Sequence, residues 1–156
     1  MAQSNYLLKL QDKVLKYPFG KKIFSRMFAS QAPYFKSIKP HIVTLEENFC
    51  QVLIPKRKAV HNHIGTVHAI AICNGLEMAM GAMTEASLPK HLRWLPKGMD
   101  VNYLAKSTTD ITCEAKIDPA KWQEGDVSVE VRALDSKGTV VVDGEIRLWV
   151  SLKPQK

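Results

Sequence analysis

The sequence predicts an α+β fold in which an antiparallel sheet of about six strands wraps around one long central helix. Three observations predict it. A strongly apolar segment of helical length occupies residues 69–87. Two segments before it and four after it alternate apolar and polar residues, as strands with one covered face do. A sheet with one apolar face must also bury that face, and the apolar helix is the available partner.

Two helices are predicted before the first strand. Residues 3–17 place leucines on one side and lysines around the other, which is the periodicity of an amphipathic helix. Pro18 and Gly20 end this pattern. A second, short helix is predicted over 21–29, with apolar side chains available for burial.

Strand-like alternation then marks both flanks of the central segment. Each stretch presents small or branched apolar residues on one face and polar residues on the other. Residues 135–138 contain Asp, Ser, Lys and Gly, and they are suited to a hairpin turn between the last two strands. The alternating segments, in chain order, are 41–47, 49–55, 101–105, 111–117, 127–133 and 140–151.

Composition indicates one soluble globular domain. The chain has 156 residues, of which 46% are hydrophobic and 24% charged. We predict an N-terminal basic helical extension over 1–36 and a main part over 37–156. Three cysteines without metal-type spacing favour a reducing, cytoplasmic setting. No signal peptide or membrane-spanning run is recognisable, so no stable membrane insertion is expected.

The net charge of +7 is concentrated at the N-terminus. Residues 1–40 hold eight of the 22 basic residues and only one of the 15 acidic ones, so the remainder is neutral. Such a segment can meet phosphates, an anionic membrane surface or nucleic acid, or it can be a solvated helix face. No nucleic-acid-binding motif is recognisable, so a nucleic-acid partner is not expected.

The central helix carries one carboxylate that needs an explanation. Apolar residues on nearly every side predict a helix buried all round, and an unpaired glutamate, Glu77, is costly in such a place. Residues three and four apart share a helix face, and Gly81 leaves room beside Glu77. A groove for a narrow ligand, a dimer mate or solvent are the alternatives for this face. The predicted polar stripe consists of Asn74, Glu77, Gly81, Thr84 and Glu85.

The start of the same helix favours developing negative charge. Free backbone N–H groups at a helix N-terminus, here around Ala69, suit an oxyanion. Together with the amide of Asn62 and the carboxylate of Glu77, this indicates equipment for hydrolysing an activated acyl group, with Glu77 as base or nucleophile.

These residues resemble the hotdog-fold acyl-CoA thioesterases of the phenylacetate-degradation type. Their pattern is Asn-x-x-Gly-x-x-His-Gly-Gly, followed by a helical Asp or Glu nine residues after the His. Asn62, Gly65, His68 and Glu77 keep that spacing, and Thr66 lies within it. The resemblance extends over the order of elements from about residue 40 to 152. The helical prefix resembles that of an uncharacterised bacterial branch of the superfamily.

The resemblance implies a role for each matched residue. Glu77 would be the catalytic carboxylate, Asn62 would orient the water or the thioester carbonyl, the Ala69 N–H would form the oxyanion hole, and His68 would shape the loop. It also implies a site between two protomers of a homodimer or a dimer of dimers. Coenzyme A would be part of the substrate, with no cofactor and no metal. The predicted substrate-binding residues are Gly65, Thr66, Ile70, Asn74 and Gly81.

The chain departs from the family pattern at one place. Ala69 and Ile70 stand where the family has two glycines, and Ile70 would narrow the approach of the thioester to the backbone. An alternative function is therefore a non-catalytic acyl-CoA or lipid-binding module.

A second alternative reaction is hydration or dehydration of a β-hydroxyacyl thioester, in which His61 or His63 would move the proton. The same pair is a weak zinc pattern, and Cys73 is better explained as a core residue than as a nucleophile.

Overall fold

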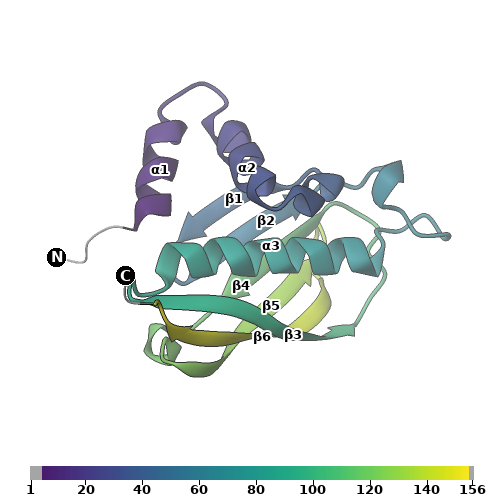
Figure 1. The fold of residues 1–156 in the computed structure, drawn as a ribbon. Coiled ribbons are helices and arrows are strands. Elements are labelled where there is room, and N and C mark those ends of the chain that lie inside the picture. The colour runs from purple at the N-terminus through teal and green to yellow at the C-terminus, as the bar shows by residue number, and fades with distance from the viewer. Residues whose placement is uncertain (1–4, 155–156) are drawn as a thin grey trace.

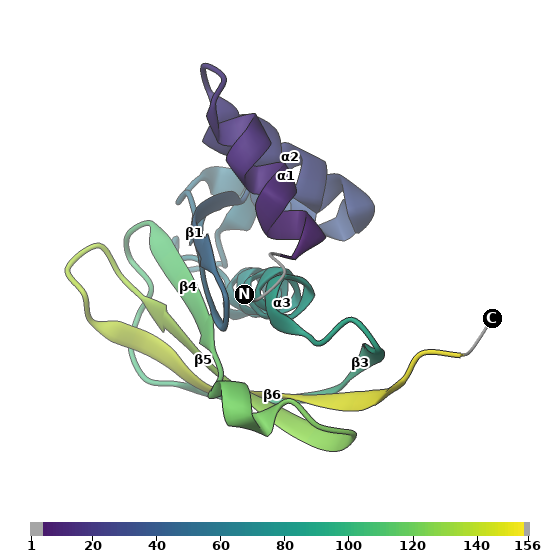
Figure 2. The same ribbon diagram turned by 90° about the vertical axis from the view of Figure 1, so that its left-hand side faces the viewer.

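The computed structural model describes residues 5–154 and confirms the predicted architecture. Its six strands form one antiparallel sheet in the order β1-β2-β4-β5-β6-β3, and the long helix α3 lies across the concave face (Figure 1). The helices of the prefix lie on the far side of α3 from the sheet (Figure 2). The α-helices and strands are α1 (Tyr6–Leu15), α2 (Gly20–Gln31), β1 (His41–Glu46), β2 (Phe49–Ile54), α3 (Ala69–Ser87), β3 (Leu92–Tyr103), β4 (Ile111–Lys116), β5 (Gly125–Leu134) and β6 (Val140–Leu152).

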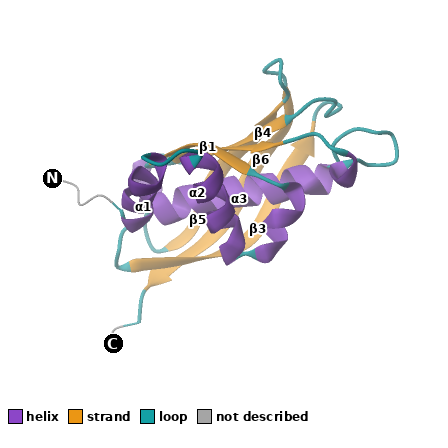
Figure 3. Ribbon diagram, turned by 90° about the horizontal axis from the view of Figure 1, so that it is seen from above, coloured by secondary structure: helices purple, strands orange, loops and turns teal. Residues whose placement is uncertain are grey.

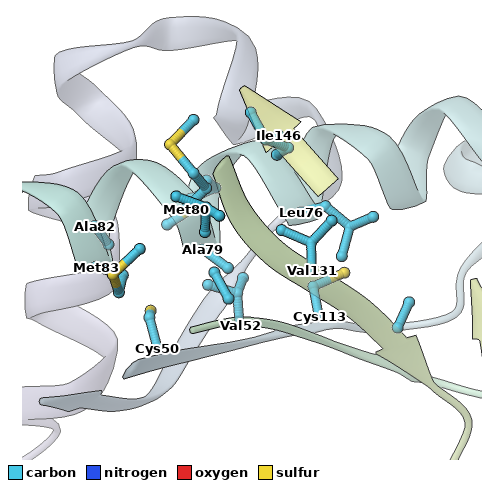
Figure 4. Close-up of a cluster of buried hydrophobic side chains, with 14 of the residues drawn as sticks. Cys50, Val52, Leu76, Ala79, Met80, Ala82, Met83, Cys113, Val131 and Ile146 are labelled. Atoms are coloured by element: carbon cyan, nitrogen blue, oxygen red, sulfur yellow. The ribbon is translucent and has the colours of Figure 1, made fainter. Parts of the chain in front are cut away.

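The central helix is the element that the sequence predicts best, since α3 has the predicted bounds. Its sheet-facing side chains, together with those of β2, β4, β5 and β6, form a cluster of fully buried apolar groups (Figure 4). Three of its methionines, Met78, Met80 and Met83, are completely buried in this core. They fill the space between helix and sheet, as flexible thioether side chains do well.

Gly75 sets how closely α3 approaches the sheet. A Cβ atom at this position would lie 2.5 Å from Cδ1 of Ile54 and 2.8 Å from Sγ of Cys113, both in the fully buried core. Close-packed interiors do not absorb an added methyl group without moving their neighbours. The helix therefore sits one methyl group closer to β2 and β4 than any larger residue would allow.

Replacing Gly75 with alanine is therefore expected to lower the free energy of unfolding by ~1–3 kcal/mol, the usual cost of overpacking a core. The matched control is Gly81→Ala in the same helix, where a new Cβ would meet only Cη2 of Trp94 at 3.7 Å, an ordinary contact. Alanine there should be neutral or stabilising, because it favours the helix. Urea denaturation of both variants checks this, and equal midpoints for the two would contradict the packing argument.

The helical prefix is packed into the same domain. Phe24 and Ala29 of α2 are buried in the main core. The hydroxyl of Ser25, also buried, accepts a hydrogen bond of 2.8 Å from the backbone N–H of Ile42 in β1. At the start of α1, Nδ2 of Asn5 donates to the carbonyl of Glu85, near the end of α3. Seen from above, α1 and α2 lie over α3 at successive places along its length (Figure 3).

The helix bounds of the prefix differ little from the prediction. The first helix begins at Tyr6, and the part of the predicted 3–17 helix before Asn5 lies outside the described residues. The second helix is longer than predicted and is followed directly by a 3-10 helix over Pro33–Ile38. This 3-10 helix packs against α2 and α3.

Strand β3 is the main difference from the prediction. The sequence pattern marks only its end, at 101–105, whereas the strand begins at Leu92. Pro96 interrupts the alternation, but proline is tolerated because β3 is an edge strand, and the register shifts between Pro96 and Gly98. Within the described chain, β3 pairs only with β6, so its outer edge is open.

Candidate functional site

Glu77 lies midway along α3, on the face turned away from the sheet. The prediction of a helix buried all round is wrong on this face, where Ile70, Glu77 and Glu85 are exposed and Cys73 is half-buried. The sheet covers one side of α3 only, and the prefix covers another, which leaves this strip open. Glu77 therefore keeps its hydration in the protomer. Within residues 5–154, no hydrogen bond or ion pair reaches its carboxylate.

A large apolar groove runs beside this carboxylate. Its volume is about 1310 Å³, and Glu77, Gly81 and Glu85 of α3 lie along it. Trp94 of β3 forms part of the opposite wall, and its indole N–H donates to Oε1 of Glu85 at 2.7 Å. Of the two groove carboxylates, Glu85 is thus held by a protein partner and Glu77 is available to a ligand.

The prefix supplies much of the groove wall. Sequence reasoning missed this, because the amphipathic pattern of α1 and α2 predicts an apolar face without saying what it faces. The apolar side chains that the prefix contributes are Leu7, Leu10, Phe24, Met27, Phe28 and Phe35. Three cationic residues from the β3 and β6 ends, Lys90, Arg93 and Lys153, lie at the same groove.

Two members of the predicted polar stripe do not face this groove. Asn74 is buried, and its Nδ2 donates to Oγ of Ser37 at 3.2 Å, under the 3-10 helix that follows α2. Its Oδ1 is also buried and has no hydrogen-bond partner among the described residues. Thr84 is buried as well and donates to the carbonyl of Met80 at 2.8 Å. Gly81 does lie where the stripe predicts, beside Glu77.

The loop before α3 is a turn held together by Asn62. Its Oδ1 accepts from the N–H groups of Ile64 and Thr66, each at 3.1 Å, and its Nδ2 donates to Oγ1 of Thr66 at 2.8 Å. Gly65, with φ +79°, adopts the left-handed conformation that closes the turn. An amide nitrogen carries two hydrogens, so one remains for a ligand.

The first turn of α3 has two backbone N–H groups, those of Ala69 and Ala71, without an acceptor among the described residues. His68 is the N-cap, and its Nδ1 accepts from the N–H of Ile70 at 3.1 Å. The N–H of His68 itself donates to the carbonyl of Val60. Because the helix N-terminus is the positive end of the helix dipole, the N–H of Ala69 is available to an anion. Ile70 is 54% exposed beside it.

The structure also bears on the metal site and the reactive cysteine that the sequence raised as alternatives. No cluster of three or more metal-binding side chains occurs in the part of the chain that the structure describes. Sγ of Cys73 lies 3.9 Å from the hydroxyl of Tyr103, and partial burial raises the pKa of this thiol. Burial also raises the pKa values of the Cys50 and Cys113 thiols in the core.

A family model covers residues 20–150 of the chain, and the family is described as a domain of unknown function, DUF4442. The chain belongs to this family. The comparison of this DUF4442 protein with curated proteins gives no match. A solved structure described as genomics APC5556 shares 41% sequence identity with it, covers 95% of this chain and 99% of its own, and superimposes with a TM-score of 0.83.

More distant structures define the fold of this DUF4442 protein. A protein of unknown function and probable thioesterase from Pseudomonas aeruginosa, PA5026, is 19% identical, with a TM-score of 0.75 over 81% of this chain and 92% of its own. A thioesterase family protein from Silicibacter pomeroyi is 16% identical, with a TM-score of 0.71 over 87% of this chain and 100% of its own. The fold is thus the hotdog fold of thioesterase-family proteins, as the sequence motif predicts.

Proposed function

We propose that this DUF4442 protein hydrolyses the thioester of an acyl-coenzyme A that carries an apolar acyl group. One observation carries the proposal: Glu77 is an exposed carboxylate without a partner among residues 5–154, in the middle of the central helix and directly beside an apolar groove. A general base must reach water and substrate without a competing protein partner. The thioesterase descriptions of two hotdog-fold neighbours support the same reaction class.

The groove fits the two chemically different halves of such a substrate. Its apolar walls, from the prefix on one side and Trp94 and Leu95 on the other, suit an acyl chain. Arg93 and Lys153 supply positive charge for the phosphates of coenzyme A at the same groove. Coenzyme A thus enters as part of the substrate, and the reaction requires no separate cofactor.

A complete site requires a second copy of the chain. Ala69 and Glu77 are eight residues apart on one helix, which corresponds to roughly 12 Å along the axis. One thioester carbonyl cannot meet both groups from the same protomer. The open outer edge of β3, with Leu95 exposed, offers a surface for a partner strand. We therefore propose a homodimer, or a dimer of dimers, in which the Ala69 N–H and Asn62 of one protomer face Glu77 of the other.

The reaction then follows from these groups. Glu77 removes a proton from water, and the resulting hydroxide attacks the thioester carbonyl carbon. The carbonyl oxygen becomes an oxyanion, which the Ala69 N–H stabilises at the helix N-terminus. When the carbon–sulfur bond breaks, the proton passes from Glu77 to the leaving thiolate. The products are a carboxylic acid and free coenzyme A. In the alternative route, Glu77 attacks the carbonyl carbon, the carbon–sulfur bond breaks and coenzyme A leaves as the thiolate. Water then hydrolyses the acyl-Glu77 anhydride to the carboxylic acid and free Glu77, and the thiolate takes up the proton that water releases.

A hydrolysis screen over short aliphatic, long aliphatic and aromatic acyl-CoA substrates tests the proposal, with release of free thiol as the readout. We expect turnover, and faster turnover for substrates whose acyl group fills the apolar groove. The exposed Ile70 at the helix start is the observation that favours the alternative, a binding module without turnover. Tight binding of acyl-CoA without thiol release from any substrate would establish that alternative and overturn hydrolysis.

A further inference from the structure

The turn between α1 and α2 presents apolar side chains to solvent at a projecting end of the molecule. This hairpin tip, residues 15–23, extends from the body on the side away from the sheet in two perpendicular views (Figures 1 and 2). Phe19 is 81% exposed and Tyr17 68%. Leu15 and Ile23, one on each helix, are also exposed. Four large apolar residues are thus exposed at or next to one protruding turn.

The tip is a rigid turn. Gly20 is buried, and a Cβ atom there would collide with the backbone carbonyl of Val14, so α2 begins in direct contact with the end of α1. Hydrogen bonds from the N–H of Tyr17 to Val14 and from the N–H of Gly20 to Tyr17 close the turn. The aromatic rings are thus presented by a fixed backbone, which lowers the entropy lost on binding.

Phe19 has a backbone conformation that is unfavourable for a bulky residue. Its φ is +61°, in the left-handed region, where glycine and asparagine are common and a bulky residue is an outlier. The ring gains no buried contact in return, because it is almost fully exposed. A strained backbone that holds an exposed ring outward indicates a role for the ring in contact with something else.

Positive charge predominates around the tip, because Asp12 is the one acidic residue among residues 1–40. The described ion pairs all lie between residues 97 and 147, so none involves the prefix. One lysine of the tip, Lys21, donates to the carbonyl of Val43 at 3.2 Å and leans toward the body. The exposed basic residues on and near the tip are Lys13, Lys16, Lys21, Lys22 and Arg26.

We infer that the hairpin tip docks onto the surface of an anionic lipid bilayer, with Tyr17 and Phe19 inserted at headgroup depth. Aromatic rings favour the bilayer interface, and lysines beside them are attracted to anionic headgroups. Docking is peripheral, because no described helix is long and apolar enough to span a membrane. The inference is independent of turnover and concerns a surface outside the groove.

The chemistry of the tip favours lipid over other occupants. Single-stranded nucleic acid is bound in grooves where bases stack on aromatic rings beside the tracked backbone. Here the rings protrude from a convex turn. Two copies of the tip would bring their lysines together, and like charges would oppose that contact. A fluid bilayer, in contrast, accepts a small convex apolar projection ringed by positive charge.

Cosedimentation with vesicles tests the inference on the full chain without substrate. We expect binding to vesicles of phosphatidylcholine mixed with phosphatidylglycerol, weaker binding as salt is raised, and little binding to pure phosphatidylcholine. Replacing Lys13, Lys16 and Lys22 with glutamine should weaken binding to the anionic vesicles by at least about tenfold. Equal binding to both kinds of vesicle, or to neither, would overturn the inference.

Phe19→Gly separates a lipid contact from a structural role. Glycine relieves the left-handed backbone, so the thermal midpoint should stay the same or rise while vesicle binding falls. Tyr34→Ser, which removes an exposed aromatic ring away from the tip, is the matched control and should bind like the parent chain. Unchanged vesicle binding by Phe19→Gly, a change in its oligomeric state, or stronger binding to single-stranded oligonucleotides than to vesicles would each overturn lipid docking.

Discussion

Replacing Glu77 with glutamine is expected to lower kcat for acyl-CoA hydrolysis by about 10³-fold, within the range that removal of a general base usually costs. The amide keeps the size and much of the polarity of the carboxylate but cannot accept a proton from water. Since Glu77 is exposed and makes no hydrogen bond or ion pair within residues 5–154, the thermal midpoint should not fall. Thiol release under saturating acyl-CoA, together with circular dichroism, measures both.

The chain provides a matched control in Glu85, the second exposed carboxylate on the same groove. It lies two turns beyond Glu77 and accepts the indole N–H of Trp94 at 2.7 Å, and a glutamine oxygen can accept the same bond. Glu85→Gln should therefore retain most of the activity. If both variants hydrolyse acyl-CoA at the rate of the parent protein, Glu77 is not the base. Both variants should still bind acyl-CoA, because the apolar walls of the groove are unchanged.

The sequence predicts the parts of the fold that a simple local pattern describes, either a long apolar run or the alternation of apolar and polar residues. The helix bounds 69–87 follow from a long apolar run and the alternating strands from burial of one face, and both agree closely with the structure. The first half of β3 was not, because Pro96 breaks the alternation, and only its position at the sheet edge makes the proline acceptable. Local pattern does not tell which strand will be an edge.

The same difference between local pattern and long-range packing applies to the candidate site. Helical spacing related Gly81 to Glu77, and the structure places both beside the groove. The link between Glu77 and the helix start came from the free N–H groups there and from the family pattern, and it stays a prediction. The same spacing put Asn74 on the open face, but the turn after α2 covers it. How the prefix packs over α3 is a long-range contact that helical periodicity does not encode. The groove wall formed by α1 and α2 was therefore beyond sequence reasoning.

Gly81 lines the groove from α3, beside Glu77, so a larger side chain there can close the acyl site without altering the carboxylate. A side chain larger than alanine would extend from α3 toward Trp94, whose indole is fixed by Glu85, so the ring cannot move aside freely. Gly81→Leu should fill the space beside Glu77 and reduce kcat/KM for long acyl-CoA substrates by about 10²-fold, since small misplacements of substrate cost this much.

The comparison of Gly81→Leu with Gly81→Ala gives this prediction its control. Alanine brings a Cβ only to 3.7 Å from the Trp94 ring, so activity should stay near that of the parent protein on every substrate. Leucine should spare the shortest acyl groups relative to the longest, because only long chains need to pass the blocked segment. A uniform loss over all chain lengths would instead mean that the acyl group lies elsewhere, and that the groove formed by the prefix is not its binding site.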